Sequence, residues 1–431
     1  MSARRARGRS APSSPAAAAR PVREQPIGPP LHPRRAAGGT PPVAGPVALQ
    51  ALALETTQAI QDLAHSIRLI ASKATVVRIY LTPEPGLQAP VTVTGELAWR
   101  RGLASPIAFL PALNTVRLDP GAAQPSLLAR RADVGLSLNF RLPAAAVAAG
   151  PLEVRLNRVM VVGGPDADLT GPAAQAQVLR FDAAAPLRVR IIGLRYTVPE
   201  TGQTSTPDAV HFEFIRSWMG RAYPVAAVEW SQIVVDADFT APFTPPTVFS
   251  SGTAGRANAQ IAALRAADVA AGTDPRTHYY GLVADAGGTH FLRGLAFGIP
   301  QTADPSVVAS GPAGVPNGFA GDQDRSYADW YTAHELGHTF GRFHPGFPAG
   351  EQDASDPAFP HPNGQLSDGA EPGVVGLDLG DPALQLPMRA LPGDVCHDVM
   401  TYADNQWLSP HTYEAIYQRL LEEDQLGPPV A

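Results

Sequence analysis

The interpretation of this chain depends on one stretch, His334-Glu-Leu-Gly-His-Thr-Phe-Gly-Arg-Phe-His344. In an α-helix, residues four positions apart lie about 40° apart around the axis and one turn along it. His334 and His338 therefore project from the same face, where two imidazoles can reach one metal ion at about 2.0–2.1 Å each. Glu335 points to the side of that face, so it can act on a water as a general base without being a ligand.

His344 can become a third ligand if the helix ends before it, because a continued helix would carry it too far along and around the axis. Gly341 allows this, since glycine readily adopts the positive φ of a left-handed helix end. Pro345 then disfavours a return to helical structure. Three histidines with an open fourth position predict one catalytic zinc ion. The residues alone leave two alternatives: a surface helix with unrelated histidines, and a metal site without activity.

A second element, Asp398-Val-Met-Thr-Tyr402, follows the histidine motif. Together the two elements resemble the metzincin superfamily of zinc endopeptidases, in which an extended histidine motif precedes a methionine-containing turn. The resemblance implies that Met400 forms an apolar floor beneath the imidazoles. It also implies that Tyr402 helps to stabilise the oxyanion of the tetrahedral intermediate. The alternatives are an ordinary core methionine and a packed or surface tyrosine.

More loosely, residues 50–425 resemble a bacterial group of large secreted metzincins that carry a β-sandwich before the protease domain. This resemblance implies action outside the cell, although residues 1–10 are not followed by the apolar segment of a signal peptide. It also implies that Gly294, Leu295 and Ala296 belong to an edge strand that pairs with an extended substrate, the alternative being an ordinary strand.

Residues 1–185 are predicted to form a leader followed by a β domain. Residues 1–46 are rich in Ala, Pro, Arg and Gly and have few large apolar residues, which predicts disorder. Residues 47–73 fit either an amphipathic helix or short strands, and the resemblance favours strands. Further on, apolar and polar residues alternate, as in Val77–Leu81 and Leu152–Leu156, which is typical of antiparallel strands around one core. We therefore predict an immunoglobulin-like β-sandwich over residues 47–185.

Residues 186–431 alternate strand and helix patterns, which predicts a mixed α/β layer fold, interpreted through the resemblance as a metzincin-like catalytic domain. One helix is expected to begin at Pro207. A second helix is expected to run through His338, with Asp324 or Ser326 as its N-cap. Residues 346–395 are expected to form a surface loop around the cleft. A calcium site in this loop is a weaker hypothesis than solvated acids, and its candidate ligands are Asp353, Asp356, Asp368 and Asp378.

Net charge, the length of apolar stretches and cysteine content limit the classes of protein to which this chain can belong. The formal net charge is −6 and the pI about 6.0, which argues against a nucleic-acid binder. No apolar stretch approaches the roughly 18 residues of a membrane span, and the single cysteine excludes an intrachain disulfide. The sequence thus predicts a zinc endopeptidase acting on proteins or peptides. The main rival is a catalytically inactive zinc-binding surface or adhesion protein whose β-sandwich binds a partner.

Overall fold

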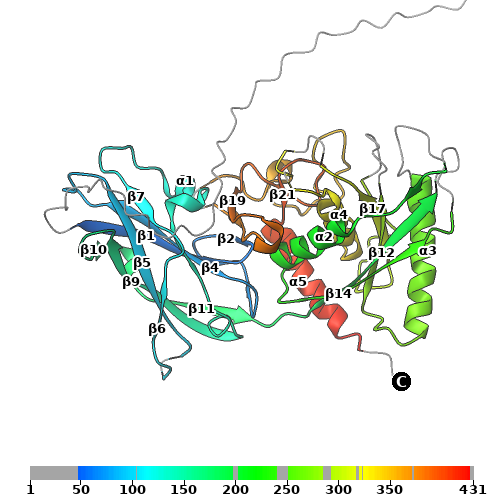
Figure 1. The fold of residues 1–431 in the computed structure, drawn as a ribbon, viewed down its shortest axis with the longest axis horizontal. Helices are drawn as coiled ribbons and strands as arrows, with labels where there is room; N and C mark the ends of the chain where they lie inside the picture. Colours follow the sequence, from blue (N-terminus) through cyan, green and yellow to red (C-terminus); the bar gives the residue numbers. More distant parts are fainter. Residues whose placement is uncertain are drawn as a thin grey trace, which may run out of the picture. The chain divides into compact units, whose positions relative to one another are not determined.

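The computed structural model describes residues 47–102, 104–197, 202–239, 251–284, 293–316, 320–322, 324–370 and 373–427. The predicted disordered leader, residues 1–46, lies outside these ranges. Most regular structure is β-sheet, divided among several sheets, with few helices (Figure 1). Within the described ranges, no helix has both the length and the apolar character needed to cross a membrane.

Two sheets in the N-terminal half enclose one apolar core. The first has the order β10-β1-β4-β8, and the second β3-β11-β9-β5-β6 with β7 also paired to β5. Buried residues of both sheets, such as Ile79, Phe140, Val93 and Leu156, form a single cluster. The alternating stretches predicted as strands are therefore confirmed. The strands are β1 (Ala48–Thr57), β3 (Leu69–Ile70), β4 (Val76–Pro83), β5 (Val91–Arg100), β6 (Ala108–Pro111), β7 (Val116–Leu118), β8 (Leu138–Arg141), β9 (Gly150–Val161), β10 (Asp168–Thr170) and β11 (Gln177–Asp182). A short helix, α1 (Leu127–Arg131), precedes β8.

The helical alternative for residues 47–73 is wrong, because this segment contains the strands β1, β2 (Ile60–Gln61) and β3 joined by turns, and no helix. Strand β1 pairs antiparallel with β4, and the register shifts between Ala51 and Ala53. Such an irregularity moves the buried positions by one residue, so the apolar spacing departs from two. Ile60 and Ile70, which continued the apparent helical period, lie in separate strands, β2 and β3.

The C-terminal half contains a mixed sheet with the order β13-β12-β15-β17-β16, and β14 also pairs with β12. Strands β14, β12, β15 and β17 are parallel, and β16 runs antiparallel at the edge beside β17. The bounds are β12 (Leu187–Thr197), β13 (Thr204–Ser205), β14 (Val228–Asp236), β15 (His278–Ala284), β16 (Leu295–Ala296) and β17 (Ala309–Ala313).

Helices cover both faces of this sheet, which explains why its central strands are apolar on both sides. Val189 and Ile191 of β12 share a core with α2 (Ala209–Ala222), α4 (Ala328–Thr339) and α5 (Pro410–Asp424). Ile192 and Leu194, on the opposite face, pack with α3 (Ser251–Ala270). The expected start of the first helix at Pro207 is two residues early: Asp208 is still extended, with ψ of 154°, and occupies the N-cap.

Residues 346–395 are not simply the surface loop that we expected. They contain β18 (Val375–Asp378) and β19 (Arg389–Pro392), which form a three-stranded sheet with β2. Leu377 donates its backbone N–H to Ala59 O at 2.8 Å, and the Trp407 indole donates to the same oxygen, also at 2.8 Å. Val375 and Leu377 are buried, so burial of apolar residues outweighs the loop-like Asp, Gly and Pro content. Two short parallel strands, β20 (His397–Asp398) and β21 (Gln406–Trp407), follow.

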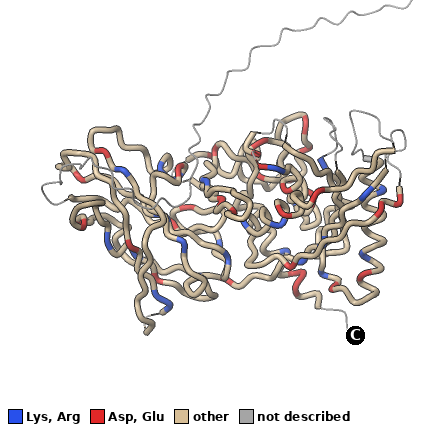
Figure 2. Tube along the Cα trace, viewed as in Figure 1, with Lys and Arg blue, Asp and Glu red and all other residues tan. Residues whose placement is uncertain are grey.

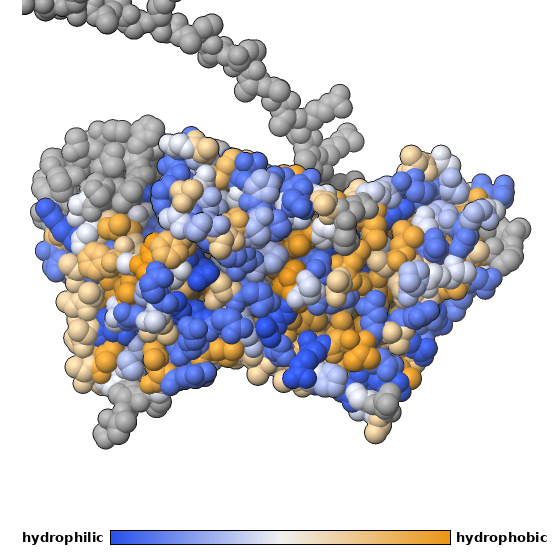
Figure 3. Space-filling view, turned by 180° about the vertical axis from the view of Figure 1, so that it is seen from behind, coloured by the Kyte–Doolittle hydropathy of each residue, from blue (hydrophilic) through white to orange (hydrophobic). Residues whose placement is uncertain are grey.

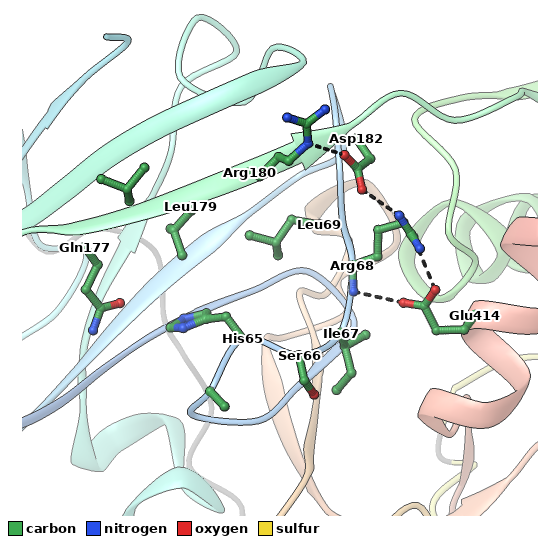
Figure 4. A pocket seen from close by; sticks show the side chains of 12 residues that line it. His65, Ser66, Ile67, Arg68, Leu69, Gln177, Leu179, Arg180, Asp182 and Glu414 are labelled. Carbon is green, nitrogen blue, oxygen red and sulfur yellow. Dashed lines mark hydrogen bonds and ion pairs between the residues drawn. The ribbon is translucent and has the colours of Figure 1, made fainter. Parts of the chain in front are cut away.

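A second link between the halves passes through Arg68. Its guanidinium lies 2.7 Å from Asp182 at the end of β11 and 3.2 Å from Glu414 in α5, and its backbone N–H also binds Glu414 (Figure 4). These groups border an open cavity of about 580 Å³. Because the ion pairs are partly exposed, each is worth about 0.2–1 kcal/mol, so Arg68 fixes geometry more than stability.

Charged residues of both signs are interspersed along the described chain (Figure 2). The face displayed in Figure 3 likewise mixes hydrophilic and hydrophobic residues. A local gathering of one sign of charge therefore stands out against this background and needs its own explanation.

Candidate metal centre

Helix α4 carries the first part of the histidine motif and is buried along its whole length. Tyr327 occupies its N-cap. The expected cap residues still shape this end, because the Ser326 hydroxyl accepts the Ala328 N–H at 3.2 Å and Asp324 accepts the Ser326 N–H at 2.8 Å. The cap prediction was therefore wrong, by one residue for Ser326 and by three for Asp324.

Gly341 ends the helix as the sequence predicted, with φ of +79°. Its N–H donates to His338 O at 2.8 Å, and the Arg342 N–H donates to Gly337 O at 2.9 Å. These two bonds are those of a left-handed helix end in the Schellman arrangement. A Cβ at position 341 would lie 2.6 Å from Pro300 O, so no other residue fits without movement. The chain reverses here and returns His344 to the helix.

The three histidines converge. Nε2 of His334 lies 3.2 Å from Nε2 of His344, and the rings of His338 and His344 are centred 4.7 Å apart. One ligand atom from each of the three lies within 4.8 Å of the others. Two nitrogens bound tetrahedrally to one zinc at about 2.0–2.1 Å would be about 3.3 Å apart, close to the observed spacing. The donor set and its spacing therefore fit a zinc ion.

The other ring nitrogen of each histidine is held by an oxygen. His334 Nδ1 lies 2.7 Å from Val399 O, and His338 Nδ1 lies 2.8 Å from Arg342 O. A carbonyl oxygen can only accept, so both Nδ1 atoms carry the proton and both Nε2 atoms present a lone pair. His344 Nδ1 lies 2.6 Å from the Asp353 carboxylate. This is the outer-shell pattern that orients metal-ligating histidines.

Electrostatics keep two of the ligands neutral. Burial lowers the pKa of His338 to about 4, helped by the neighbouring His344. Burial and the two other histidines also hold the pKa of His334 well below its usual range. Neutral imidazole is the form that binds a metal ion, so these rings need not lose a proton at neutral pH to bind one.

Glu335 is buried beside the histidines and faces the edge strand. Burial raises its pKa to about 8, opposed by a hydrogen bond with the backbone of Ala296. Its side chain occupies the space beside Gly294, where any Cβ would overlap the carboxylate. A cation held by the three imidazoles would lower this pKa again, because it favours the charged carboxylate.

Met400 lies against the metal-site helix. It is buried, and its sulfur occupies the place that a side chain at Gly337 would need. Gly337 lies one residue before His338, so the thioether packs on the ligand-bearing turn of α4. Met400 therefore packs on the helix that carries His334 and His338, and its role as an apolar floor beneath the imidazoles stays a prediction.

Tyr402 stands beside the histidines, with its ring centred 5.2 Å from that of His344 and 5.6 Å from that of His334. Arg293 holds it: the guanidinium donates to Tyr402 O at 2.7 Å and lies 5.3 Å from the ring centre. Because Arg293 immediately precedes Gly294, the edge strand and the methionine turn are tied together at the site.

The predicted substrate strand is short. Of the stretch Gly294–Gly298, the residues Leu295 and Ala296 form β16, which pairs antiparallel with Ser310 and Ala309 of β17. Strand β16 lies at the edge of its sheet, and Ala296 contacts Glu335. An edge strand next to the candidate base is thus present, although it has only 2 residues.

The four acids considered for calcium are engaged separately. Asp353 binds His344, Asp356 lies 2.9 Å from His411, Asp378 pairs with Arg221, and Asp368 accepts the Ala370 N–H at 3.1 Å. Among the described residues, the three histidines are the one group of three or more metal-ligating side chains with converging donor atoms. The described structure therefore contains no carboxylate cluster for calcium in this loop.

Three neighbours of the site were not anticipated in these roles. Asp353 was considered only as a calcium ligand, and nothing in the sequence pointed to Arg293. Gln352 is also unforeseen: it accepts the backbone N–H groups of Gly346 and Phe347 and donates to Met400 O at 2.8 Å. These residues lie in irregular segments, where no periodicity indicates which way a side chain points.

No protein-family model matches this sequence, and no curated protein matches it either. The functional interpretation accordingly depends on the residues of the site itself.

Proposed function

We propose that the protein is a zinc-dependent endopeptidase, with His334, His338 and His344 as ligands. The observation that carries this proposal is the convergence of three Nε2 lone pairs beside a buried carboxylate, with each Nδ1 anchored from behind. A purely structural zinc site would be closed by a fourth protein ligand. In the described residues, no fourth histidine, cysteine or carboxylate joins the group.

The fold fits the same proposal. A mixed sheet with an antiparallel edge strand, a ligand-bearing helix on one face and a methionine turn beneath the histidines is what a metzincin-like domain requires. We assign residues 186–431 to that domain and residues 47–185 to an immunoglobulin-like β-sandwich. The two-sheet core of the N-terminal half supports the second assignment.

The chain's own residues supply the proton chemistry. When bound, zinc would polarise the scissile carbonyl and acidify a water. Glu335 accepts a proton from the water as its oxygen attacks the carbonyl carbon. The same carboxyl group then returns that proton to the amide nitrogen as the C–N bond breaks. Atoms balance, with one peptide bond and one water giving one carboxylic acid and one amine, which ionise to carboxylate and ammonium at neutral pH.

Other groups bind and orient the substrate. Among the described residues, no strand pairs with the other side of β16, so we infer that an extended peptide pairs there, with its scissile bond beside Glu335. We infer that the Tyr402 hydroxyl donates to the developing oxyanion, because the tyrosine ring lies beside those of His334 and His344. The Arg293 guanidinium fixes the position of Tyr402 by contacting the backbone carbonyl and the ring of the tyrosine.

The proposal is tested with the purified full chain, by measuring bound metal and the degradation of casein and gelatin. We expect one zinc per chain, cleavage that stops with a chelator, and cleavage that is restored by added zinc. Glu335→Ala should keep the metal and lose cleavage. Metal binding without any cleavage by the wild type would instead favour the inactive surface or adhesion protein. Cleavage that persists in Glu335→Ala would refute the role of the base.

A further inference from the structure

One ammonium group is buried without a counter-ion among the described residues. Lys73 is the only lysine among the 33 Lys and Arg residues of the chain. It lies between β3 and β4 and is only 3% exposed. Its ammonium donates to Gly220 O, in the last turn of α2, at 2.6 Å. Within the described chain, no carboxylate lies within ion-pair distance of it, and an ammonium buried in this way is costly unless an anion compensates it.

The ammonium borders a small cavity with an excess of positive charge. The cavity has a volume of about 240 Å³, and Lys73, Arg141 and Arg221 all line it. Asp381 is the one acid among its described lining residues. That carboxylate is already engaged, by the Ser217 hydroxyl at 2.6 Å and by the Ala383 N–H at 3.0 Å.

The two arginines differ in what they already bind. Arg221 pairs with the buried Asp378 and also donates to Ser217. Arg141, at the end of β8, forms no side-chain ion pair with the described residues, and its side chain is exposed. Guanidinium groups stay charged at any physiological pH and present forked donors that match an oxyanion. The positive potential therefore persists whatever the protonation state of Lys73.

We propose that this cavity binds a small oxyanion, such as phosphate or a small carboxylate, between the Lys73 ammonium and the Arg141 guanidinium. The anion would compensate the buried charge and connect the segment before β4 to the end of α2 and residues 379–382. The burial-lowered pKa of Lys73, about 7, is consistent with a missing counter-ion.

The site also connects to the metal-site helix. Tyr223, the C-cap of α2 two residues after Arg221, donates its hydroxyl to Ala333 O of α4 at 2.9 Å. Ala333 directly precedes His334, so an anion that steadies the end of α2 also steadies the helix bearing two of the candidate ligands. This proposal does not depend on the chain being a protease.

Gly220 provides a way to block the cavity without removing a charge. It lies in α2 and lines the cavity, and a Cβ placed on it meets no atom within 4 Å. Gly220→Leu would therefore fill the space without a backbone clash. Lys73→Met removes the ammonium and keeps most of the volume. Arg180→Met removes an exposed guanidinium elsewhere and serves as the control.

The test is thermal unfolding of the full chain with inorganic phosphate or malonate, compared with chloride at equal ionic strength. We expect phosphate or malonate at about a hundred times its Kd to raise Tm by roughly 3 °C. The anion that gives the larger increase in Tm is the one that the cavity prefers. Arg180→Met should keep the shift, whereas Lys73→Met and Gly220→Leu should lose it. Wild type without an oxyanion-specific shift, or an equal shift in both cavity variants, would overturn the proposal. Should Lys73→Met fail to fold, Gly220→Leu alone decides.

A chemical readout uses the uniqueness of Lys73. An amine-reactive acylating reagent can label this side chain and the N-terminal amine, and mass spectrometry distinguishes the two. Bound phosphate should slow acylation of Lys73 and leave the N-terminal amine unchanged. Equal rates at Lys73 with and without phosphate would contradict binding at this cavity.

Discussion

The Asp353 carboxylate lies 2.6 Å from Nδ1 of His344, whereas His334 and His338 are held from behind by backbone carbonyls. The third candidate ligand is therefore the one whose orientation depends on a side chain. We expect Asp353→Ala to weaken zinc affinity about 10–100-fold, as is usual when an outer-shell partner is lost. Competition with a chromophoric chelator measures this. Asp368→Ala, in the same acidic segment, should bind zinc like the wild type, and equal affinities in all three proteins would refute the role of Asp353.

Met400 packs so closely on the metal-site helix that any side chain at position 337 would overlap it. Gly337→Ala should lower the free energy of unfolding by about 1–3 kcal/mol, because the methyl group overlaps the thioether sulfur. Gly255 offers a matched control in helix α3, where a Cβ meets no atom within 4 Å. Gly255→Ala should raise stability by up to about 1 kcal/mol through helix propensity. Urea unfolding of both variants provides the comparison, and equal effects at the two glycines would exclude tight packing at Met400.

Arg293 acts through Tyr402 if the proposed function is correct. Arg293→Met should lower kcat about 10–100-fold with little change in KM or zinc content, since a misplaced oxyanion donor costs transition-state stabilisation. Tyr402→Phe should lower kcat similarly. Steady-state kinetics of the double variant are decisive, because adding Arg293→Met to Tyr402→Phe should cost little more. Fully additive losses would show that Arg293 acts independently of the tyrosine hydroxyl.

Buried acids before and within helix α4 predict a pH-dependent stability. Burial and the charge of Asp324 raise the pKa of Asp322 to about 8. Burial and the charges of Asp324 and Asp322 raise the pKa of Asp329 well above its usual range. The folded state then holds protons that an unfolded aspartate, with a pKa of about 3.9, releases. Stability from these groups is complete below about pH 4 and is lost as the pH rises toward about 8.

Asp329→Asn isolates this effect, because it removes one charge and keeps the shape. Relative to wild type, the variant should gain stability as the pH rises from about 5 to 8. Arg389 and Arg221 oppose the raised pKa values through their charge, so the gain is partial. Denaturant unfolding across this range measures it. A constant difference between the two proteins at every pH would mean that Asp329 does not titrate with folding.

Local signals in the sequence were sufficient for much of the site. The spacing of His334 and His338 and the conformational freedom of Gly341 are local properties, and the structure has both. The alternation of apolar residues likewise located strands such as β4 and β9. Where a register shift intervenes, as between Ala51 and Ala53 in β1, the period of two is lost and a helical count arises by accident.

Long-range partners were beyond such signals. Strand β18 pairs with β2, so that Val375 lies opposite Gln61. The local sequence of neither segment predicts this pairing. Arg293 reaches Tyr402 from an irregular segment, and Asp353 reaches His344 across a loop. Such contacts depend on how distant segments meet, which composition and periodicity do not describe.

The three-stranded sheet of β19, β18 and β2 also limits how the chain can be divided for study. A recombinant fragment that begins at residue 186 would lack Ile60 and Gln61, so β18 would lose one neighbour. Its unpaired backbone groups would form an exposed edge, a template for intermolecular pairing. The same truncation would leave the Trp407 indole without its acceptor at Ala59. Expression of the C-terminal half by itself should therefore give aggregation-prone material.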